Sequence, residues 1–355
     1  MPATLDVALV GCGFFARNHL NAWRDLAGEG SNLRLVAVCD VDPAKAQAAA
    51  AEFGARHWYD DAAAMLDAER PGLVDIVTRM DTHRALVEVA AARGVPVIVQ
   101  KPLAPDWGEA VTIVETAAAA AVPMAVHENF RFQAPMRRVR EVLASGEIET
   151  PSWARIAFRT GYDVYRTQPY FYDEERLAIL DVGIHVLDLA RVFLGEVERV
   201  SCETQRRNPR VRAEDTATML LRHEGGAVSV VECTYESRAL PDPFPQTLLT
   251  IEGPAGSVRL HEDFRMVVTS SGDAREEHVG SPLLAWTSEP WHVAQESVLL
   301  TQRHIVDALR AGREPETTGE DNLRTFALVE AAYEAAATGR AVAPRRWKPP
   351  TPSAG

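Results

Sequence analysis

The segment that most constrains the fold is a short apolar run, Leu5–Val10, that leads directly into Gly-x-Gly-x-x-Ala. The run is typical of a buried strand, and the residues after the motif favour a helix. Gly11 permits a tight turn off the strand, and Gly13 has no Cβ, so that a pyrophosphate can approach the backbone closely. Ala16 is small enough for the helix to pack against a sheet. The pattern predicts a dinucleotide-binding turn with the phosphates at the helix N-terminus.

An acidic residue follows the next apolar run and bears on which dinucleotide is bound. Leu33–Cys39 reads as a second strand, and it ends at Asp40. A carboxylate at this place accepts hydrogen bonds from the ribose hydroxyls and repels a 2′-phosphate. Asp42 adds a second negative charge, so the sequence favours NAD over NADP. The alternative is a glycine turn in an ordinary α/β protein, which the order of strand, turn, helix and acid makes less favoured.

Composition narrows the class of protein. The 355 residues suffice for about two domains, and the formal net charge of −13 argues against nucleic acid and anionic membranes as partners. The four cysteines show no metal-ligand spacing, so we expect thiols in a reducing cytoplasm and no metal site. The N-terminus has neither a basic region nor an unbroken apolar run, so we expect no signal peptide and no membrane span.

Apolar strand runs alternate with amphipathic helices up to about residue 130, which predicts a doubly wound parallel sheet covered on both faces. We expect this α/β domain to be a Rossmann domain over residues 1–128. Besides the two strands already given, the expected strands are 73–77, 95–99 and 124–127, and the expected helices are 44–53, 60–66, 83–93 and 106–121.

From about residue 151 the runs alternate between apolar and polar residues, which is typical of strands in a mostly antiparallel sheet. We expect an α+β domain over residues 129–343, followed by a loose tail over 344–355. The expected strands are 153–158, 197–203, 217–222, 227–234, 247–251, 257–260 and 266–269, and the expected helices are 174–194, 291–311 and 320–338.

Three polar residues are candidates for chemistry. Lys101 follows a core strand, at the sheet edge where ligands bind in open α/β folds. Asp181 and His185 are four residues apart on the expected long helix, hence on one face. Gly183 lies between them and lowers the bulk where a sugar could approach. Each residue also has an ordinary interpretation: a solvated lysine, a surface ion pair, or a buried histidine with satisfied hydrogen bonds.

Several motifs occur together in the expected order. They are Gly11–Ala16, Gln100-Lys101-Pro102 and Asp181-Val182-Gly183-Ile184-His185. With them the chain resembles the Gfo/Idh/MocA oxidoreductases over nearly its whole length. The resemblance extends to Thr82-His83, Gly94-Val95-Pro96-Val97, Gly319-Glu320-Asp321-Asn322-Leu323 and Gly339-Arg340.

The resemblance implies a nicotinamide cofactor in the first domain and a second domain whose large sheet builds homodimers or homotetramers. It implies that Lys101 contacts substrate and cofactor, that His185 is the general base, and that Asp181 orients the substrate. Gln100 departs from the family pattern, which has a glutamate there. The residues expected to bind the cofactor are Gly11, Gly13, Phe14, Phe15, Ala16, Asp40, Thr78, His83 and Lys101.

Further polar and aromatic residues are expected to contact the substrate. Asn129 and Arg131 follow the last Rossmann strand, and Tyr165 lies in a tyrosine-rich loop over residues 159–172. Such a loop suits a sugar or polyol, although packing of the loop on a neighbouring subunit explains it equally well.

We therefore expect an NAD-dependent dehydrogenase that oxidises a hydroxyl of a sugar or polyol. An aldose that gives a lactone is preferred to an inositol, and the resemblance points to a branched pentose such as apiose. The alternatives are a glycoside hydrolase that uses NAD transiently and a non-catalytic NAD-binding sensor. A hydrolase yields no net NADH, and a sensor has no need of Lys101, Asp181 and His185 together.

Overall fold

The computed structural model describes residues 4–30 and 32–348, which form two compact units. The first unit holds the described residues up to 129, together with 298–323 and 347–348. The second unit holds residues 130–297 and 324–346. The first unit therefore includes two C-terminal segments, 298–323 and 347–348, besides the residues 1–128 expected for the first domain. Most of the expected loose tail, from residue 349 onward, lies outside the described residues.

The first unit contains a six-stranded parallel sheet with the order β3-β2-β1-β4-β5-β6. This order is that of a doubly wound Rossmann fold, so the predicted fold class is confirmed for this unit. Leu9 on the central strand pairs with Val38 on one side and Asp75 on the other. The strands are β1 (Leu5–Val10), β2 (Leu33–Cys39), β3 (His57–Tyr59), β4 (Leu73–Ile76), β5 (Val97–Gln100) and β6 (Met124–His127).

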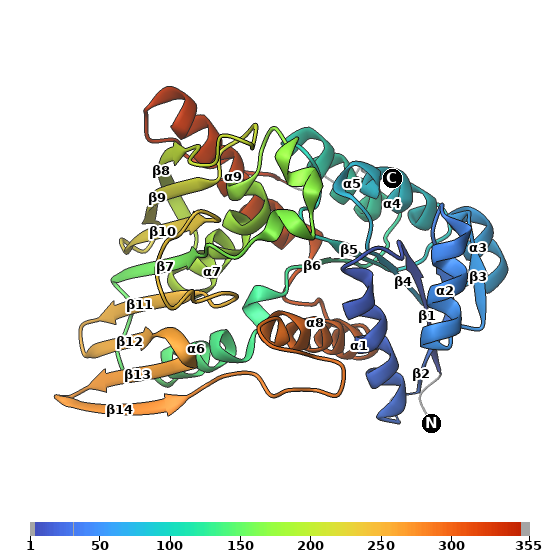
Figure 1. The fold of residues 1–355 in the computed structure, drawn as a ribbon, viewed down its shortest axis with the longest axis horizontal. Helices are drawn as coiled ribbons and strands as arrows, with labels where there is room; N and C mark the ends of the chain where they lie inside the picture. Colours follow the sequence, from blue (N-terminus) through green and yellow to red (C-terminus); the bar gives the residue numbers. More distant parts are fainter. Residues whose placement is uncertain (1–3, 31, 349–355) are drawn as a thin grey trace, which may run out of the picture. The chain divides into compact units, whose positions relative to one another are not determined.

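The helices of this unit begin where the sequence supplies caps. The side chains of Asp42, Asp61 and Asp106 each accept a hydrogen bond from a backbone N–H in the first turn of the helix that follows. Strand β3 was not predicted, because three residues are too few to show a period. The helices are α1 (Ala16–Gly28), α2 (Pro43–Phe53), α3 (Ala62–Glu69), α4 (His83–Ala91) and α5 (Trp107–Ala119) (Figure 1).

The second unit contains an eight-stranded sheet with the order β14-β13-β12-β11-β7-β10-β9-β8 (Figure 1). Its pairs are antiparallel except for β7 with β10, so the prediction of a mostly antiparallel sheet is confirmed. Helix α6 packs on β12, and α7 packs on β7 and β10. The elements are β7 (Trp153–Arg159), β8 (Val197–Gln205), β9 (Thr216–His223), β10 (Val228–Thr234), β11 (Leu248–Gly253), β12 (Gly256–Leu260), β13 (Arg265–Ser270), β14 (Asp273–His278) and α6 (Ala134–Ser145).

The long helix expected over residues 174–194 is shorter in the structure. A π-helical turn covers Ile179–Gly183, and α7 continues over Ile184–Leu194. The Glu214 side chain accepts hydrogen bonds from the backbone N–H groups of Leu177 and Ile179. These two N–H groups are satisfied from outside the helix, which explains why it begins late. Helices α8 (His292–Arg310) and α9 (Gly319–Thr338) were both predicted. No helix in residues 4–30 and 32–348 is long and apolar enough to cross a membrane.

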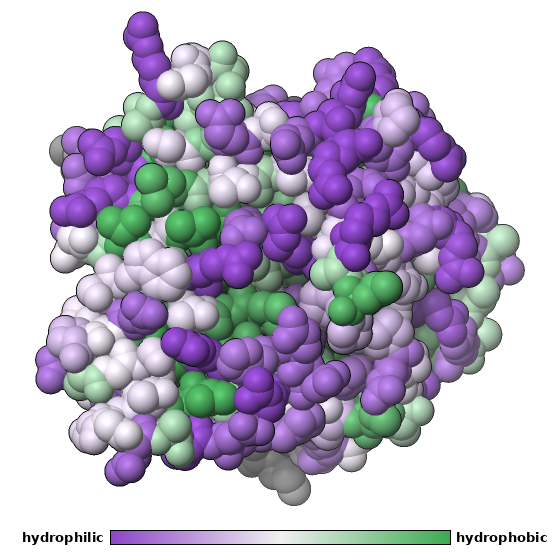
Figure 2. All heavy atoms as spheres, turned by 60° about the vertical axis from the view of Figure 1, so that its left-hand side comes forward, coloured by the Kyte–Doolittle hydropathy of each residue, from purple (hydrophilic) through white to green (hydrophobic). Residues whose placement is uncertain are grey.

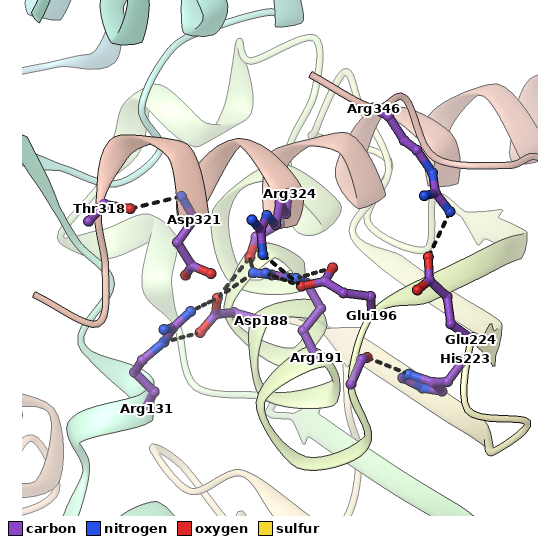
Figure 3. A network of polar contacts seen from close by, with 12 residues as sticks. Arg131, Asp188, Arg191, Glu196, His223, Glu224, Thr318, Asp321, Arg324 and Arg346 are labelled. Atoms are coloured by element: carbon purple, nitrogen blue, oxygen red, sulfur yellow. Dashed lines mark hydrogen bonds and ion pairs between the residues drawn. The ribbon is translucent and has the colours of Figure 1, made fainter. Parts of the chain in front are cut away.

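A buried ionic network anchors α7 within the second unit (Figure 3). The Arg131 guanidinium binds both carboxylate oxygens of Asp188, and the Nε–Oδ2 distance is 2.8 Å. The Thr325 hydroxyl also donates to Asp188, at 2.8 Å, and Arg191 bonds to Thr325 and Glu196. Because the Asp188 side chain is fully buried, its charge depends on these partners.

Asp188→Ala should lower the free energy of unfolding by about 3–5 kcal/mol, because it leaves the buried Arg131 charge without its carboxylate. Urea unfolding followed by far-UV circular dichroism measures the loss. The control is Arg346→Ala, which removes an ion pair with Glu224 whose side chains are 75% and 47% exposed. It should cost less than about 1 kcal/mol. Equal effects of the two substitutions would contradict the role given to the network.

Candidate active site

The glycine-rich turn after β1 is shaped by one close approach. Gly11 has a φ of +95°, and a Cβ at this position would lie 2.4 Å from the carbonyl oxygen of Val77, which follows β4. No larger residue fits there. Gly13 has no neighbour within 4 Å of where its Cβ would lie, and Phe15 at the N-cap of α1 makes no side-chain capping bond. The turn therefore offers open space and backbone N–H groups to a phosphate.

Asp40 is fixed at the edge of this turn. Its carboxylate accepts hydrogen bonds from the backbone N–H groups of Cys12, at 2.7 Å, and Asp42, at 2.9 Å. Such a held carboxylate fits a ribose with both hydroxyls free, and it opposes a 2′-phosphate. Asp42 itself caps α2 through Ala44. Burial, with the charge of Asp40, raises the pKa of the Cys12 thiol to about 12, so this thiol is protonated at neutral pH.

Thr78 lies just after β4, and His83 is the first residue of α4. The His83 ring is fully buried, with Nδ1 at 3.0 Å from the Leu103 carbonyl oxygen and Nε2 at 3.2 Å from that of Thr78. Burial lowers the pKa of His83, which keeps the ring neutral. These contacts favour a role in holding the turn after β4 to the segment after Lys101. Direct contact of His83 with the cofactor stays a prediction.

Lys101 follows β5 at the carboxyl edge of the six-stranded sheet, as the sequence predicted. Its backbone N–H donates to the Oε1 of Gln100 at 2.7 Å. Gln100 is largely buried, so the side chain of the preceding residue holds the peptide that carries Lys101.

In the second unit, Asp181 lies on the π-helical turn and is held by a tyrosine. The Tyr235 hydroxyl, just after β10, donates a short hydrogen bond to Oδ2 of Asp181. Burial and the charge of Asp181 raise the pKa of Tyr235 well above its usual value, so the hydroxyl stays a donor. A π-helical turn often marks a functional position. Tyr235 was not predicted from the sequence, because it lies 54 residues from Asp181.

His185 lies at the start of α7, and an aromatic side chain sets the plane of its ring. The ring stacks on Phe130, with a centroid separation of 3.8 Å and an angle of 1° between the planes. Phe130 opens a short 3₁₀ turn, Phe130–Phe132. The stack fixes the directions in which the two ring nitrogens point, as a general base requires.

Gly183 has a different role from the one expected. A Cβ at this position would lie 3.1 Å from the Ala178 carbonyl oxygen and 3.3 Å from the Cys233 sulfur on β10. The missing side chain therefore lets the π-helical turn pack closely against the sheet. The space that we expected for a sugar is filled by β10.

The expected substrate residues differ in their surroundings. Arg131 is nearly fully buried and bound to both oxygens of Asp188, which favours a structural role. The Tyr165 hydroxyl donates to Glu236 at 3.4 Å, and its ring stacks on Tyr172 with a centroid separation of 4.8 Å. Asn129 ends the first unit and is buried. Substrate contacts by Asn129, Arg131 and Tyr165 stay predictions.

Within residues 4–30 and 32–348, no three His, Cys, Asp or Glu side chains are grouped so as to hold a metal ion. His185 and Asp188 are three residues apart on α7. The His185 ring stacks on Phe130, and the Asp188 carboxylate binds Arg131.

Two family models match the chain. The Gfo/Idh/MocA model, described as an oxidoreductase family with an NAD-binding Rossmann fold, matches residues 5–128. The Gfo/Idh/MocA C-terminal domain model matches residues 136–259.

Individual proteins are similar over nearly the full length. A protein of Rhizobium rhizogenes named D-apiose dehydrogenase is 47% identical, covering 95% of this chain and 97% of its own. Another of that name, from Paraburkholderia graminis, is 47% identical, covering 94% and 88%. The crystal structure of an oxidoreductase from Agrobacterium radiobacter in complex with NAD⁺, L-tartaric acid and magnesium has a TM-score of 0.93 and 46% identity. That match covers 96% of this chain and 98% of the other.

Tyr235→Phe removes the hydroxyl that holds Asp181 and should lower kcat/KM about ten-fold or more, because a hydrogen bond to a charged group is worth about 1.5–3 kcal/mol. Steady-state kinetics measure the loss. The matched control is Tyr333→Phe, since the Tyr333 hydroxyl donates to Glu214 at 2.7 Å in the same unit. The control should lower stability and leave kcat/KM within about two-fold. If the two variants have the same kinetics, Tyr235 does not hold a functional carboxylate.

Proposed function

The chain belongs to the Gfo/Idh/MocA oxidoreductases and is an NAD-dependent dehydrogenase, and we propose that it oxidises D-apiose, a branched aldopentose, to its lactone. The observation that supports D-apiose as the substrate is the similarity, over almost the whole chain, to two proteins named D-apiose dehydrogenase. An inositol is the less favoured substrate.

His185 is the general base of this proposal. Oxidation at C1 removes the hydrogen of the C1–H bond, with its pair of electrons, as hydride. The hydroxyl on C1 loses its proton, and a C1–O double bond forms. Bound NAD supplies the hydride acceptor. His185 takes the hydroxyl proton on a ring nitrogen, and its stack on Phe130 holds that nitrogen in one direction. A positioned base of this kind contributes about 10²–10⁴-fold to a rate.

Asp181 and Lys101 have complementary parts. Asp181 orients a substrate hydroxyl, and Tyr235 donates to the same carboxylate, which limits the ways in which the carboxylate can turn. Lys101 contacts substrate and cofactor through its ammonium group. In this proposal residues 1–128 hold NAD and residues 129–343 bind the sugar. The fixed carboxylate of Asp40 supports NAD as the preferred form of the cofactor.

The proposal predicts net NADH formation when the protein is mixed with NAD and D-apiose, followed at 340 nm. NADP should support a much lower rate, and myo-inositol should be a poorer substrate. Consumption of a glycoside without net NADH would indicate the glycoside hydrolase instead. Tight NAD binding with no turnover on any sugar would indicate the sensor.

His185→Ala and Lys101→Ala should each lower kcat by about 100-fold or more, with the Kd for NAD within about three-fold of the wild-type value. Tryptophan fluorescence quenching measures the Kd. Near-normal turnover of either variant would remove that residue from the proposed mechanism.

The open face of the eight-stranded sheet supports a homodimer or homotetramer. One face packs on α6 and α7, and the other presents side chains that alternate along each strand. Figure 2 shows hydrophobic groups set among hydrophilic ones on the side where these strands lie. Leu220 on β9 is 51% exposed on this face. A row of paired residues crosses it: Ser201, Leu220, Val230, Arg155, Thr250, Arg259, Val267 and Glu276.

The same proposal places the protein in the cytoplasm. All four cysteines are thiols, and burial, the first cause in each case, raises the pKa of Cys39 and Cys202 to about 12. Such neutral thiols suit a reducing compartment.

Leu220→Glu should shift the protein towards monomers, because it would bury a carboxylate in the interface in place of an apolar side chain. Sedimentation velocity measures the change. The control is Leu283→Glu, which alters another exposed leucine outside the strands and should leave the assembly unchanged. A wild-type monomer at micromolar concentration would overturn this part of the proposal.

A further inference from the structure

A buried chain of polar side chains in the first unit runs from the middle of β4 to the backbone of Lys101. It begins at Asp75, a fully buried carboxylate on a strand with pairing partners on both sides. Oδ2 of Asp75 lies 2.8 Å from Nδ1 of His19 and accepts from Nε1 of Trp23 at 2.7 Å. Nε2 of Gln302 donates to the same oxygen at 3.2 Å. Three groups on two helices thus meet one carboxylate oxygen.

The chain of hydrogen bonds continues from His19 to Gln100. Nε2 of His19 lies 3.1 Å from Nε2 of Gln100, and Oε1 of Gln100 accepts the backbone N–H of Lys101. His19 is fully buried and Gln100 is 7% exposed. Every link is within hydrogen-bond distance, so the chain joins the sheet interior to the residue that ends β5.

Two groups that can only donate, the backbone N–H of Lys101 and the indole N–H of Trp23, determine which nitrogen of His19 carries the hydrogen. A backbone N–H can only donate, so Gln100 must present its oxygen to Lys101 and its NH₂ group to His19. Nε2 of His19 must then accept. The indole N–H of Trp23 can also only donate, so Asp75 is an acceptor and Nδ1 of His19 carries the hydrogen. A doubly protonated ring would place an N–H against the NH₂ group of Gln100.

We propose that His19 and Asp75 are positioning residues, and that a neutral His19 with hydrogen on Nδ1 orients the Gln100 amide so that it holds the Lys101 peptide. The proposal rests on the proposed function of Lys101. The effect of the chain of hydrogen bonds on catalysis passes through the peptide that carries Lys101.

Gln100→Met keeps the length of the side chain and removes both hydrogen bonds. It should lower kcat by about five-fold or more, with the Kd for NAD and the KM for D-apiose within about two-fold. The matched control is Gln133→Met, a buried glutamine in the second unit, which should leave kcat unchanged. In the Lys101→Ala background, Gln100→Met should have no further effect on kcat. Equal kcat values for Gln100→Met and Gln133→Met would overturn the inference.

Gln100→Glu tests the same geometry if Gln100→Met folds poorly. A carboxylate accepts from Lys101 and also from a doubly protonated His19, which Asp75 and the His127 ring face. Nε2 of His19 should therefore carry a hydrogen in this variant, because the carboxylate that faces it can only accept. An Nε2 of His19 that stays unprotonated in Gln100→Glu would count against the proposal.

Nitrogen-15 NMR of histidine-labelled protein detects which ring nitrogen of His19 is protonated, independently of activity. His19 should show a protonated Nδ1 and an unprotonated Nε2 in both the wild type and Lys101→Ala. An imidazolium, or hydrogen on Nε2, would overturn the inference. If Lys101→Ala instead keeps wild-type turnover, the proposed function of Lys101 fails while this tautomer can still be found. If Lys101→Ala is impaired and Gln100→Met is not, only the positioning role fails.

Discussion

The first unit depends on the close approach between the turn after β1 and the end of β4. The Val77 carbonyl oxygen occupies the place that a side chain at residue 11 would need. Because this contact is possible only with glycine, β1 and β4 can end side by side in a parallel sheet. The N-terminus of α1, the carboxylate of Asp40 and the end of β5 before Lys101 then share one edge of that sheet. The proposed cofactor site is a consequence of this packing.

The parts of the fold that were predicted from the sequence have a regular period. Strands β1, β2 and β6 were predicted with their observed bounds, since each is a mainly apolar run that ends at a polar residue or a turn. The alternation along β9 and β10 likewise predicted an antiparallel sheet, and their pairing confirms it. The resemblance to a family, and not the period, singled out Lys101, Asp181 and His185 as a set.

What the sequence could not supply are contacts between residues far apart in the chain. Tyr235 holds Asp181, and Glu214 takes two backbone N–H groups and so shortens the expected helix. Arg131 was expected to contact the substrate because it follows a strand end, and its partner Asp188, 57 residues away, was not predicted. Helix α6 and strand β14 were also missed, the latter because its residues are mostly polar and exposed. Such partners follow from tertiary packing and have no local period.

Transfer of deuterium from C1 of the sugar is the most direct test of the proposed reaction. D-Apiose that carries deuterium at C1 would be oxidised with NAD, and the NADH produced would be analysed by mass spectrometry. The mechanism predicts one deuterium on each NADH and a slower rate than with unlabelled sugar. NADH that contains only hydrogen would show that the hydride comes from another carbon, and it would contradict oxidation at C1 with His185 as the base.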